Sequence, residues 1–128
     1  MANNRTEHHR AQRWQFLRFQ DLMRERQFAM TGTEWSLFCF IYDRTWGWSK
    51  LWDRISYSQF CKGITDATGH CWHRGTGLSR SSVIRGLKSL QAKGLIETKP
   101  AGSGIAFSIK REFAPPGLFV SKFEPDTQ

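Results

Sequence analysis

The residues best suited to chemistry lie in one basic segment, Thr76–Gly94, which contains no acidic residue. Arginine can donate two parallel hydrogen bonds to a guanine edge or to a phosphate, and serine hydroxyls commonly bind phosphates. A helix that carries both kinds of side chain at its amino end suits the major groove of a DNA duplex. The predicted DNA contacts from this segment are Ser79, Arg80, Ser81, Ser82, Arg85 and Lys88.

Three features place these side chains on a helix. Ser79 is a good N-cap, because its hydroxyl can accept a hydrogen bond from a free backbone N–H of the first turn. Val83, Leu87 and Leu90 recur at helical spacing and form an apolar stripe, which leaves the basic side chains on the other side. Gly94 follows where a left-handed C-terminal cap is favoured. The segment therefore predicts a DNA-reading helix from Ser79 to just before Gly94.

A β-hairpin is predicted after this helix. Residues 95–98 form its first strand, residues 99–104 are rich in turn-forming types, and residues 105–110 alternate as a second strand. The alternation places three apolar side chains on one face of the second strand: Ile105, Phe107 and Ile109.

The tip of this hairpin adds two predicted DNA contacts, Lys99 and Ser103. Phosphate contacts are also expected from Lys93, at the end of the reading helix. Helix, turn, basic helix and hairpin is the order of a winged helix-turn-helix, a mainly α fold of the α+β class. The same pattern also fits a core helix and hairpin in any other small α+β domain.

A scaffold helix is predicted nearer the amino terminus. Thr31 and Glu34 have the spacing of a capping box, in which each side chain binds a free backbone N–H at the helix start. The helix runs to about Arg44 and ends at Gly47, where a left-handed cap is expected. Its apolar residues follow helical spacing, which favours packing in a core.

The first helix of the helix-turn-helix pair is predicted after a short strand at residues 53–56. Ser56 and Gln59 form a second capping box, and the short helix that they open ends at Gly63. This helix is expected to pack across the reading helix and to position it. Thr76-Gly77 then supplies the tight turn before Ser79.

An insertion of about ten residues, 64–75, separates the two helices, which an ordinary helix-turn-helix joins in three or four residues. Turn-forming residues at 66–69 predict a small hairpin that projects beside the reading helix. Trp72 and Arg74 are candidates for groove or backbone contacts from it. Zinc binding is the alternative for Cys61, His70, Cys71 and His73, but their spacing lacks paired C-x-x-C units, and no metal site is predicted.

The remaining segments divide the chain into an arm, one domain and a tail. Residues 1–13 are predicted to be a disordered arm, whose arginines are candidates for phosphate contacts. The domain spans residues 14–112 and begins with an extended anchor at 16–19 and a short helix at 20–26 that buries Leu22 and Met23; one longer helix from Ala11 is the alternative. Residues 113–128 form a tail whose apolar side chains either cover the domain's own core or form a homodimer contact: Leu118, Phe119, Val120 and Phe123.

Composition and charge narrow the class of protein. The chain has 128 residues and a formal charge of +8, of which residues 67–111 carry +7, with eight Lys or Arg against one acid. Such a concentration is typical of a phosphate-binding face. No apolar run approaches the roughly 18 residues of a membrane span, and no signal peptide precedes the domain. Three unevenly spaced cysteines argue against a disulfide framework, so a soluble cytoplasmic protein without membrane contact is predicted.

The ordered motifs resemble a known family over roughly residues 16–96. They read T-G-T-E, R-T-W-G-W-S-K, D-R-I-S-Y-S-Q-F and G-T-G-L-S-R-S-S-V-I-R-G-L-K-S-L-Q-A-K-G-L-I, and together they resemble the N-terminal domain of bacteriophage replication protein O. The resemblance implies a winged-helix domain that binds repeated sites at a replication origin. On that analogy, the residues at the DNA are Ser79, Arg80, Ser81, Ser82 and Arg85.

This chain departs from the family pattern in two places. The insertion at 64–75 is absent from the simplest members. Full-length members also carry a C-terminal region that engages the helicase-loading machinery of the host, and only residues 113–128 follow the domain here. Helicase recruitment is therefore not transferred to this chain, and an interaction with host replication proteins stays open.

These features favour sequence-specific binding to double-stranded DNA, in replication initiation or in transcriptional regulation of the same phage or mobile element. A second hypothesis is a phage-encoded inhibitor or adaptor that binds a protein through the same fold. No nucleophile with a matched base, no phosphate-cradling glycine loop and no metal-ligand spacing is present, so neither an enzyme nor a cofactor is predicted.

Overall fold

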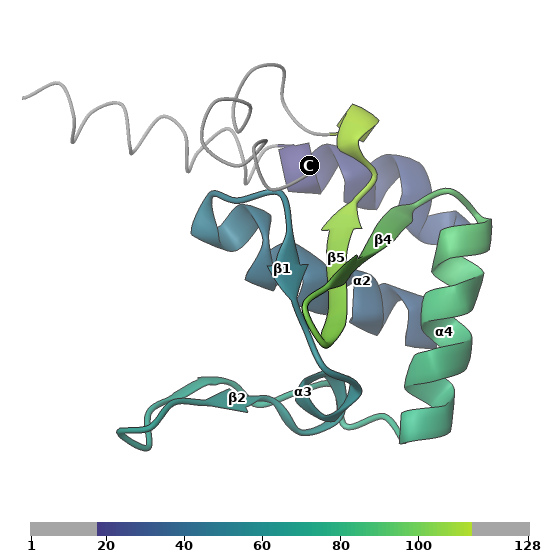
Figure 1. The fold of residues 1–128 in the computed structure, drawn as a ribbon. Helices are drawn as coiled ribbons and strands as arrows, with labels where there is room; N and C mark the ends of the chain where they lie inside the picture. The colour runs from purple at the N-terminus through teal and green to yellow at the C-terminus, as the bar shows by residue number, and fades with distance from the viewer. Residues whose placement is uncertain (1–17, 114–128) are drawn as a thin grey trace, which may run out of the picture.

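The computed structural model describes residues 18–113 as a mixed α and β structure (Figure 1). The predictions for the arm at 1–13, for residues 14–17 and for nearly all of the tail lie outside these residues. The first helix is described over residues 18–26. The other elements, in chain order, are η1 (Gln27–Ala29), α2 (Gly32–Arg44), η2 (Trp46–Trp48), β1 (Asp53–Arg54), α3 (Tyr57–Lys62), β2 (Ile64–Thr65), β3 (Cys71–His73), α4 (Arg80–Ala92), β4 (Ile96–Ala101), β5 (Gly104–Ile109) and η3 (Arg111–Phe113).

A three-stranded antiparallel sheet has the order β1-β5-β4, so β5 is its central strand. One face of the sheet packs on the helices, and the Phe107 ring meets the Phe60 ring of α3 edge-on, with 5.2 Å between centroids. Figure 1 shows α2 crossing behind the strands while α4 stands beside β4. The core between these elements is apolar and includes Leu37, Phe38, Ile41, Phe60, Val83, Leu90, Ile96, Phe107 and Ile109.

Helices α2 and α4 pack tightly on each other in the core. A Cβ added at Gly86 of α4 would lie 2.5 Å from Cδ1 of Leu37 and 3.2 Å from Cγ2 of Thr33, so glycine allows α2 to approach. One polar cluster joins the same two helices: the Glu34 carboxylate accepts hydrogen bonds from Ser89 and from Nζ of Lys93, the latter at 2.7 Å.

The predicted helix starts are confirmed. Thr31 and Glu34 form the reciprocal capping box at the start of α2, and Ser56 and Gln59 form the second one at the start of α3. The Ser79 hydroxyl accepts from the N–H of Ser82 at the start of α4. These caps are confirmed because each involves residues only three apart, so the local sequence decides them.

Two predictions about the first half of the chain need correction. The extended anchor is wrong over its described residues, and the alternative of a longer first helix agrees with them: residues 18 and 19 are helical, and the Phe19 ring packs on Tyr42 and Trp35 of α2, at 4.1 and 5.7 Å between centroids. The left-handed residue after α2 is Ser49, with φ of 58°, and not Gly47, which lies inside η2.

The hairpin turn is shorter than predicted. Lys99, Pro100 and Ala101 belong to β4, and only Gly102 and Ser103 form the loop. Gly102 has φ of +60°, which a two-residue hairpin loop favours. Pro100 fits in the strand because β4 is an edge of the sheet, where a missing N–H donor is tolerated.

Along β5, the predicted apolar face is only partly buried. Phe107 and Ile109 are buried, whereas Ile105, close to the tip, extends past the core and is 37% exposed.

The insertion forms a hairpin of β2 and β3, as predicted, but its direction differs. Figure 1 shows it extending to the side opposite α4 instead of beside it. Two glycines fix this direction, because their backbones cross: a Cβ at Gly63 would lie 2.1 Å from the carbonyl oxygen of His73, and one at Gly75 would lie 2.6 Å from the nitrogen of Gly63. The His73 ring also packs on Phe40 of α2, with 4.4 Å between centroids.

We predict that Glu34→Gln destabilises the fold in a pH-dependent way. Burial alone would raise the pKa of Glu34, but hydrogen bonds from Lys93, Ser89 and the Thr31 backbone outweigh it and lower the pKa from 4.5 to about 2. The carboxylate therefore stabilises the fold above about pH 4.5, and this contribution disappears as the pH falls toward 2. At pH 7 the loss should be about 2–3 kcal/mol, because the partly exposed Lys93 can rehydrate.

Urea unfolding of Glu34→Gln and the parent chain between pH 7 and pH 3 measures this difference. Glu25→Gln removes the same charge from an exposed position and should change stability by less than about 0.5 kcal/mol. Equal effects of the two variants, or a loss for Glu34→Gln that does not shrink below pH 4.5, would contradict the assignment.

Gly75→Ala should destabilise the fold by several kcal/mol, because the added methyl group would overlap backbone atoms of residues 61–63. Gly69→Ala is the matched control, since Gly69 has the same φ of +88° but open space around its Cα. Only the cost of the left-handed backbone, about 1–2 kcal/mol, applies there. Thermal melts would compare the two variants, and similar midpoints would show that the crossing is not a tight contact.

Candidate nucleic-acid interface

One side of α4 carries an outward stripe of small and basic side chains. Ser81, Arg85 and Lys88 are spaced so that they share one side of the helix, and all three are exposed. The opposite side is buried against α2 and α3 and consists of Val83, Gly86, Leu87 and Leu90. The fold therefore needs the apolar side for its core and leaves the basic side in solvent.

The amino end of α4 concentrates hydroxyl groups. The Ser79 hydroxyl caps the helix and lies 3.0 Å from the Ser82 hydroxyl and 3.3 Å from that of Ser81. Ser79 and Ser81 are exposed, while Ser82 is half-buried. Free backbone N–H groups and the helix dipole both favour an anion at this end.

Arg80 leaves the outward stripe and turns toward α3. Its guanidinium carbon lies 5.1 Å from the centre of the Tyr57 ring, a cation–π contact that holds the side chain in place. The side chain remains exposed. A guanidinium held in this way is already oriented for a ligand that approaches the start of α4.

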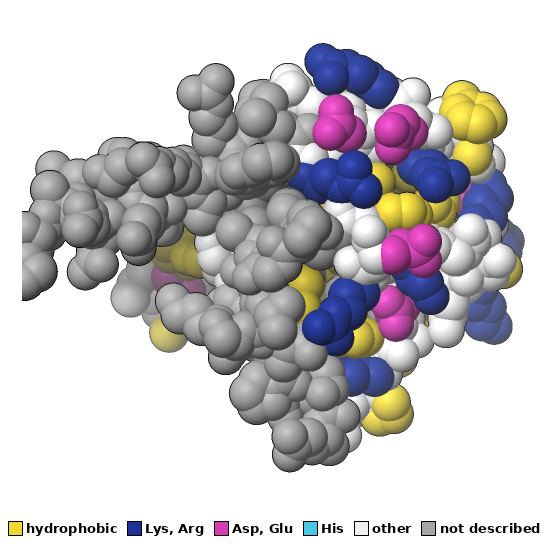
Figure 2. All heavy atoms as spheres, turned by 90° about the horizontal axis from the view of Figure 1, so that it is seen from above, with side chains coloured by type: hydrophobic (Ala, Val, Ile, Leu, Met, Phe, Trp, Pro, Cys, Tyr) yellow, Lys and Arg dark blue, Asp and Glu magenta, His cyan; other side chains and the backbone are white. Residues whose placement is uncertain are grey.

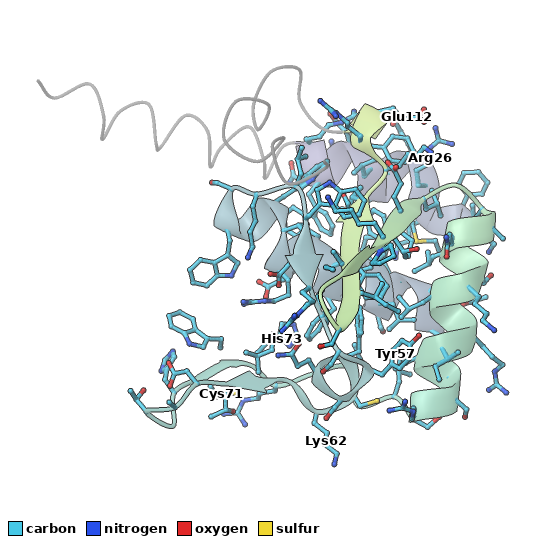
Figure 3. All side chains as sticks on the ribbon, viewed as in Figure 1. Arg26, Tyr57, Lys62, Cys71, His73 and Glu112 are labelled. Atoms are coloured by element: carbon cyan, nitrogen blue, oxygen red, sulfur yellow. The ribbon has the colours of Figure 1, made fainter. Side chains whose placement is uncertain are left out.

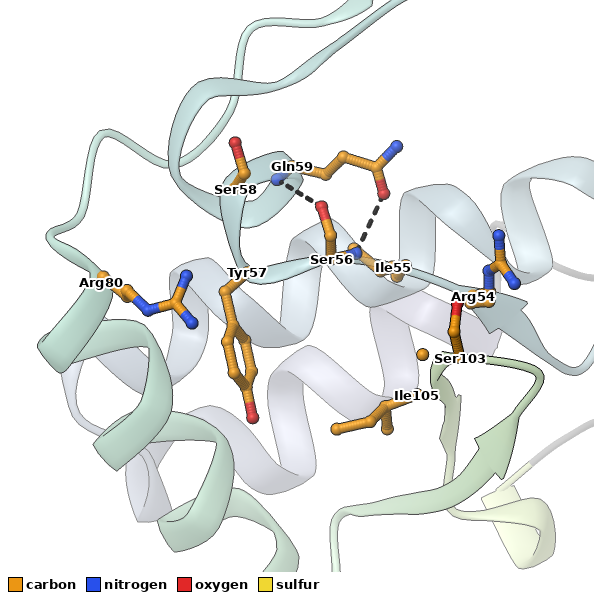
Figure 4. A pocket seen from close by; sticks show the side chains of 10 residues that line it. Arg54, Ile55, Ser56, Tyr57, Ser58, Gln59, Arg80, Ser103 and Ile105 are labelled. Carbon is orange, nitrogen blue, oxygen red and sulfur yellow. Dashed lines mark hydrogen bonds between the residues drawn. The ribbon is translucent and has the colours of Figure 1, made fainter.

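A hollow of about 540 Å³ lies between α3, the start of α4 and the tip of the β4–β5 hairpin (Figure 4). Figure 4 shows Arg80 and Tyr57 on one side of it and Arg54 with Ser103 on the other. The described residues that line it include hydroxyl, amide and basic side chains and no acid: Arg54, Ile55, Ser56, Tyr57, Ser58, Gln59, Arg80, Ser103, Gly104 and Ile105.

A second hollow, of about 470 Å³, shares Ser58 and Arg80 with the first. Its lining continues along the turn before α4 and again contains no acid among the described residues: Ser58, Cys61, Lys62, Gly77, Leu78, Ser79 and Arg80. Figure 3 shows Lys62 pointing away from the body of the molecule below α3. The two acid-free hollows therefore adjoin at Ser58 and Arg80, and together we call them the basic groove.

The basic residues of this surface are not neutralised by the described carboxylates. Within residues 18–113, the ion pairs include Arg24–Asp21, Arg44–Asp53, Lys50–Asp53 and Lys93–Glu34, and none of these involves Arg80, Arg85 or Lys88. A different face, seen in Figure 2, mixes Lys and Arg with Asp and Glu side chains. The charge on α4 is therefore free to act on an anionic partner.

The predicted site residues do not all meet in one place. Ser103 lines the basic groove, but Lys99 lies further along β4, with its Nζ 4.3 Å above the ring of Trp52. Arg74 is exposed at the base of the β2–β3 hairpin. Lys93 is paired with Glu34 and also donates to the backbone oxygen of Ala29, so its ammonium group already has two partners within the domain.

Four residues of the groove were missed by the sequence reasoning: Arg54, Tyr57, Ser58 and Lys62. Arg54 reaches the hairpin tip because β1 pairs with β5, which places Arg54 opposite Ala106. Sequence alone gives no signal for that pairing. The Ser56–Gln59 capping box did place Tyr57 and Ser58 in a first helical turn, and that signal could have marked them as neighbours of α4.

The residues considered for zinc have other contacts in the structure. His73 accepts a hydrogen bond at Nδ1 from the N–H of Gly75, and the His70 ring packs on Trp72. Among residues 18–113, no group of three or more His, Cys, Asp or Glu side chains is arranged to hold a metal ion.

Burial raises the pKa of the Cys39 thiol to about 11, so this thiol stays protonated at neutral pH.

Comparison with protein-family models, with curated proteins and with solved structures finds no match for this chain. None of the helices within residues 18–113 has the length and apolar character of a membrane-spanning segment.

Proposed function

We propose that this chain binds double-stranded DNA in a sequence-specific way, with α3 and α4 acting as a helix-turn-helix and the β4–β5 hairpin as its wing. The observation that carries the proposal is the exposed stripe of Ser81, Arg85 and Lys88, which no described carboxylate neutralises and which adjoins the acid-free basic groove. The proposed activity is binding, without a catalytic step.

The proposed reading surface assigns different tasks to neighbouring residues. In a major groove, Arg85 and Ser81 would face base edges, because they lie in the amino-terminal half of α4 on its outward stripe. The serine hydroxyls and free N–H groups at the start of α4 would bind a phosphate. Lys88 would contact the backbone of the duplex, where a point charge suffices.

The basic groove would receive the adjoining sugar-phosphate strand. Arg54 and Arg80 lie on opposite sides of the first hollow, and Ser58 and Ser103 add hydroxyl donors to its lining. Lys99 would add a backbone contact at the edge of this surface. Contacts of this kind fix the position of the duplex and strengthen binding to any sequence.

The biological role that we propose is recognition of repeated sites at the replication origin of a phage or mobile element. This part of the proposal depends on the resemblance of residues 16–96 to the N-terminal domain of bacteriophage replication protein O. Regulation of transcription in the same element would use the same surface and differ in the target site.

Selection of bound sequences from a random duplex pool tests the proposal. Enrichment of one motif that occurs as tandem repeats near the gene would support origin binding, and a single inverted repeat at its promoter would support a regulator. Recovery of no motif, together with affinity that does not change with salt, would contradict DNA recognition and favour a protein-binding role.

Arg85→Ala should weaken binding to the selected duplex by about 1–3 kcal/mol and relax preference at one base pair. Lys88→Ala and Lys99→Ala should weaken binding to duplexes of every sequence by the same factor. Both should also reduce the slope of the logarithm of affinity against the logarithm of salt concentration. Gel-shift titrations at several salt concentrations would separate the two effects.

Arg24→Ala is the matched control, because it removes a similar charge from an exposed position on the first helix, paired with Asp21. It should leave duplex affinity within about twofold of the parent chain. If Arg85→Ala behaves like Arg24→Ala, the assignment of α4 as the reading element is wrong.

A further inference from the structure

Two tryptophans that the duplex surface does not use lie against each other on the far side of the molecule. Trp48 of η2 and Trp72 of β3 are 47% and 46% exposed, and their ring centres are 5.2 Å apart in an edge-to-face contact. The His70 ring packs on Trp72 at 4.5 Å. We call Trp48, His70 and Trp72 the aromatic patch. Figure 1 shows that the β2–β3 hairpin, which carries two of its members, extends away from α4.

The Trp72 side of the patch is held by hydrogen bonds. Nε1 of Trp72 donates to Oδ2 of Asp66 at 3.0 Å, which fixes the orientation of the indole. Oδ1 of Asp66 accepts from the backbone and hydroxyl of Thr68 and from the N–H of His70. Both carboxylate oxygens of Asp66 therefore accept hydrogen bonds, which fix the hairpin turn and the Trp72 ring.

The hairpin itself is fixed to the body of the molecule. The crossing of Gly63 and Gly75 leaves no room for a side chain at its base, and His73, labelled in Figure 3, packs on Phe40. The exposed rings are thus presented by a rigid element, which lowers the entropy lost when a ligand binds.

Cationic groups accompany the rings. The guanidinium carbon of Arg44 lies 5.4 Å from the centre of the Trp48 ring, but Arg44 is largely buried and paired with Asp53. Arg74, two residues after Trp72, is exposed and can meet a phosphate. Aromatic faces next to arginines are the combination that binds unpaired nucleobases and their phosphates without strong sequence preference.

The size of the patch also points to a small ligand group. A half-exposed indole offers roughly 100 Å² of surface. Two of them fall far short of the roughly 800 Å² that each partner contributes to a stable protein interface. They match the faces of one or two bases.

We propose that the aromatic patch binds single-stranded DNA by stacking unpaired bases on Trp48 and Trp72. The inference rests on the proposed function, because a strand separated from a bound duplex is the ligand that this second site would capture. The duplex surface on α4 and the patch on the opposite side would then be separate sites with different substrates.

Binding of a fluorescein-labelled oligo(dT) of about 12 nucleotides, measured by anisotropy, tests the proposal. Trp72→Ala and Trp48→Ala should each weaken binding about 5- to 150-fold, and Trp72→Phe should restore most of it because a flat ring remains. Phe28→Ala is the control, since Phe28 is 88% exposed but lies outside the patch, and it should bind oligo(dT) like the parent chain.

The two sites can be told apart in the same experiment. Trp72→Ala should keep the affinity for the selected duplex, whereas Arg85→Ala should lose duplex affinity and keep that for oligo(dT). A parent chain that binds the duplex but not oligo(dT) would overturn the single-strand proposal and leave the proposed function intact. Tryptophan variants that bind oligo(dT) normally would do the same. A parent chain that binds oligo(dT) but no duplex would overturn the proposed function. If the parent chain self-associates and Trp72→Ala does not, as measured by sedimentation, the patch is a protein contact and the single-strand proposal is overturned.

Discussion

The contact between α2 and α4 is the constraint on which the rest of the structure depends. Gly86 lets Leu37 approach the backbone of α4, and the buried Glu34 links the two helices by accepting from Ser89 and Lys93 while it also caps α2. A glycine and a satisfied carboxylate at one interface leave little freedom in how α4 can rotate. The basic stripe faces solvent because the other side of the helix is committed to this contact.

The surface proposed to read DNA is assembled from segments that are distant in sequence. The start of α4 supplies Arg80, α3 supplies Tyr57 and Ser58, and the pairing of β1 with β5 brings Arg54 beside the hairpin tip. The cation–π contact between Arg80 and Tyr57 joins two of these segments at the centre of the surface. The same fold places an aromatic hairpin on the other side, so one small domain carries two chemically different surfaces.

Local features of the fold could be predicted from sequence, and features that depend on distant contacts could not. The caps at Thr31, Ser56 and Ser79 involve neighbours three residues apart, and the stripe of α4 follows from helical spacing. The direction of the β2–β3 hairpin depends on a backbone crossing and on ring contacts with another helix. The pairing of Lys93 with Glu34, like the place of Arg54, likewise needs the tertiary structure.

We propose above all that duplex DNA lies along the outward stripe of α4 and in the basic groove. Titration of the ¹⁵N-labelled chain with the selected duplex, followed by amide chemical shifts, tests it most directly. We expect the largest shifts at residues 79–88, at residues 57 and 58 and at the loop formed by residues 102 and 103, and we expect them to diminish as salt is added. Shifts centred on the β2–β3 hairpin, or confined to residues outside α3, α4 and the β4–β5 loop, would contradict the claim.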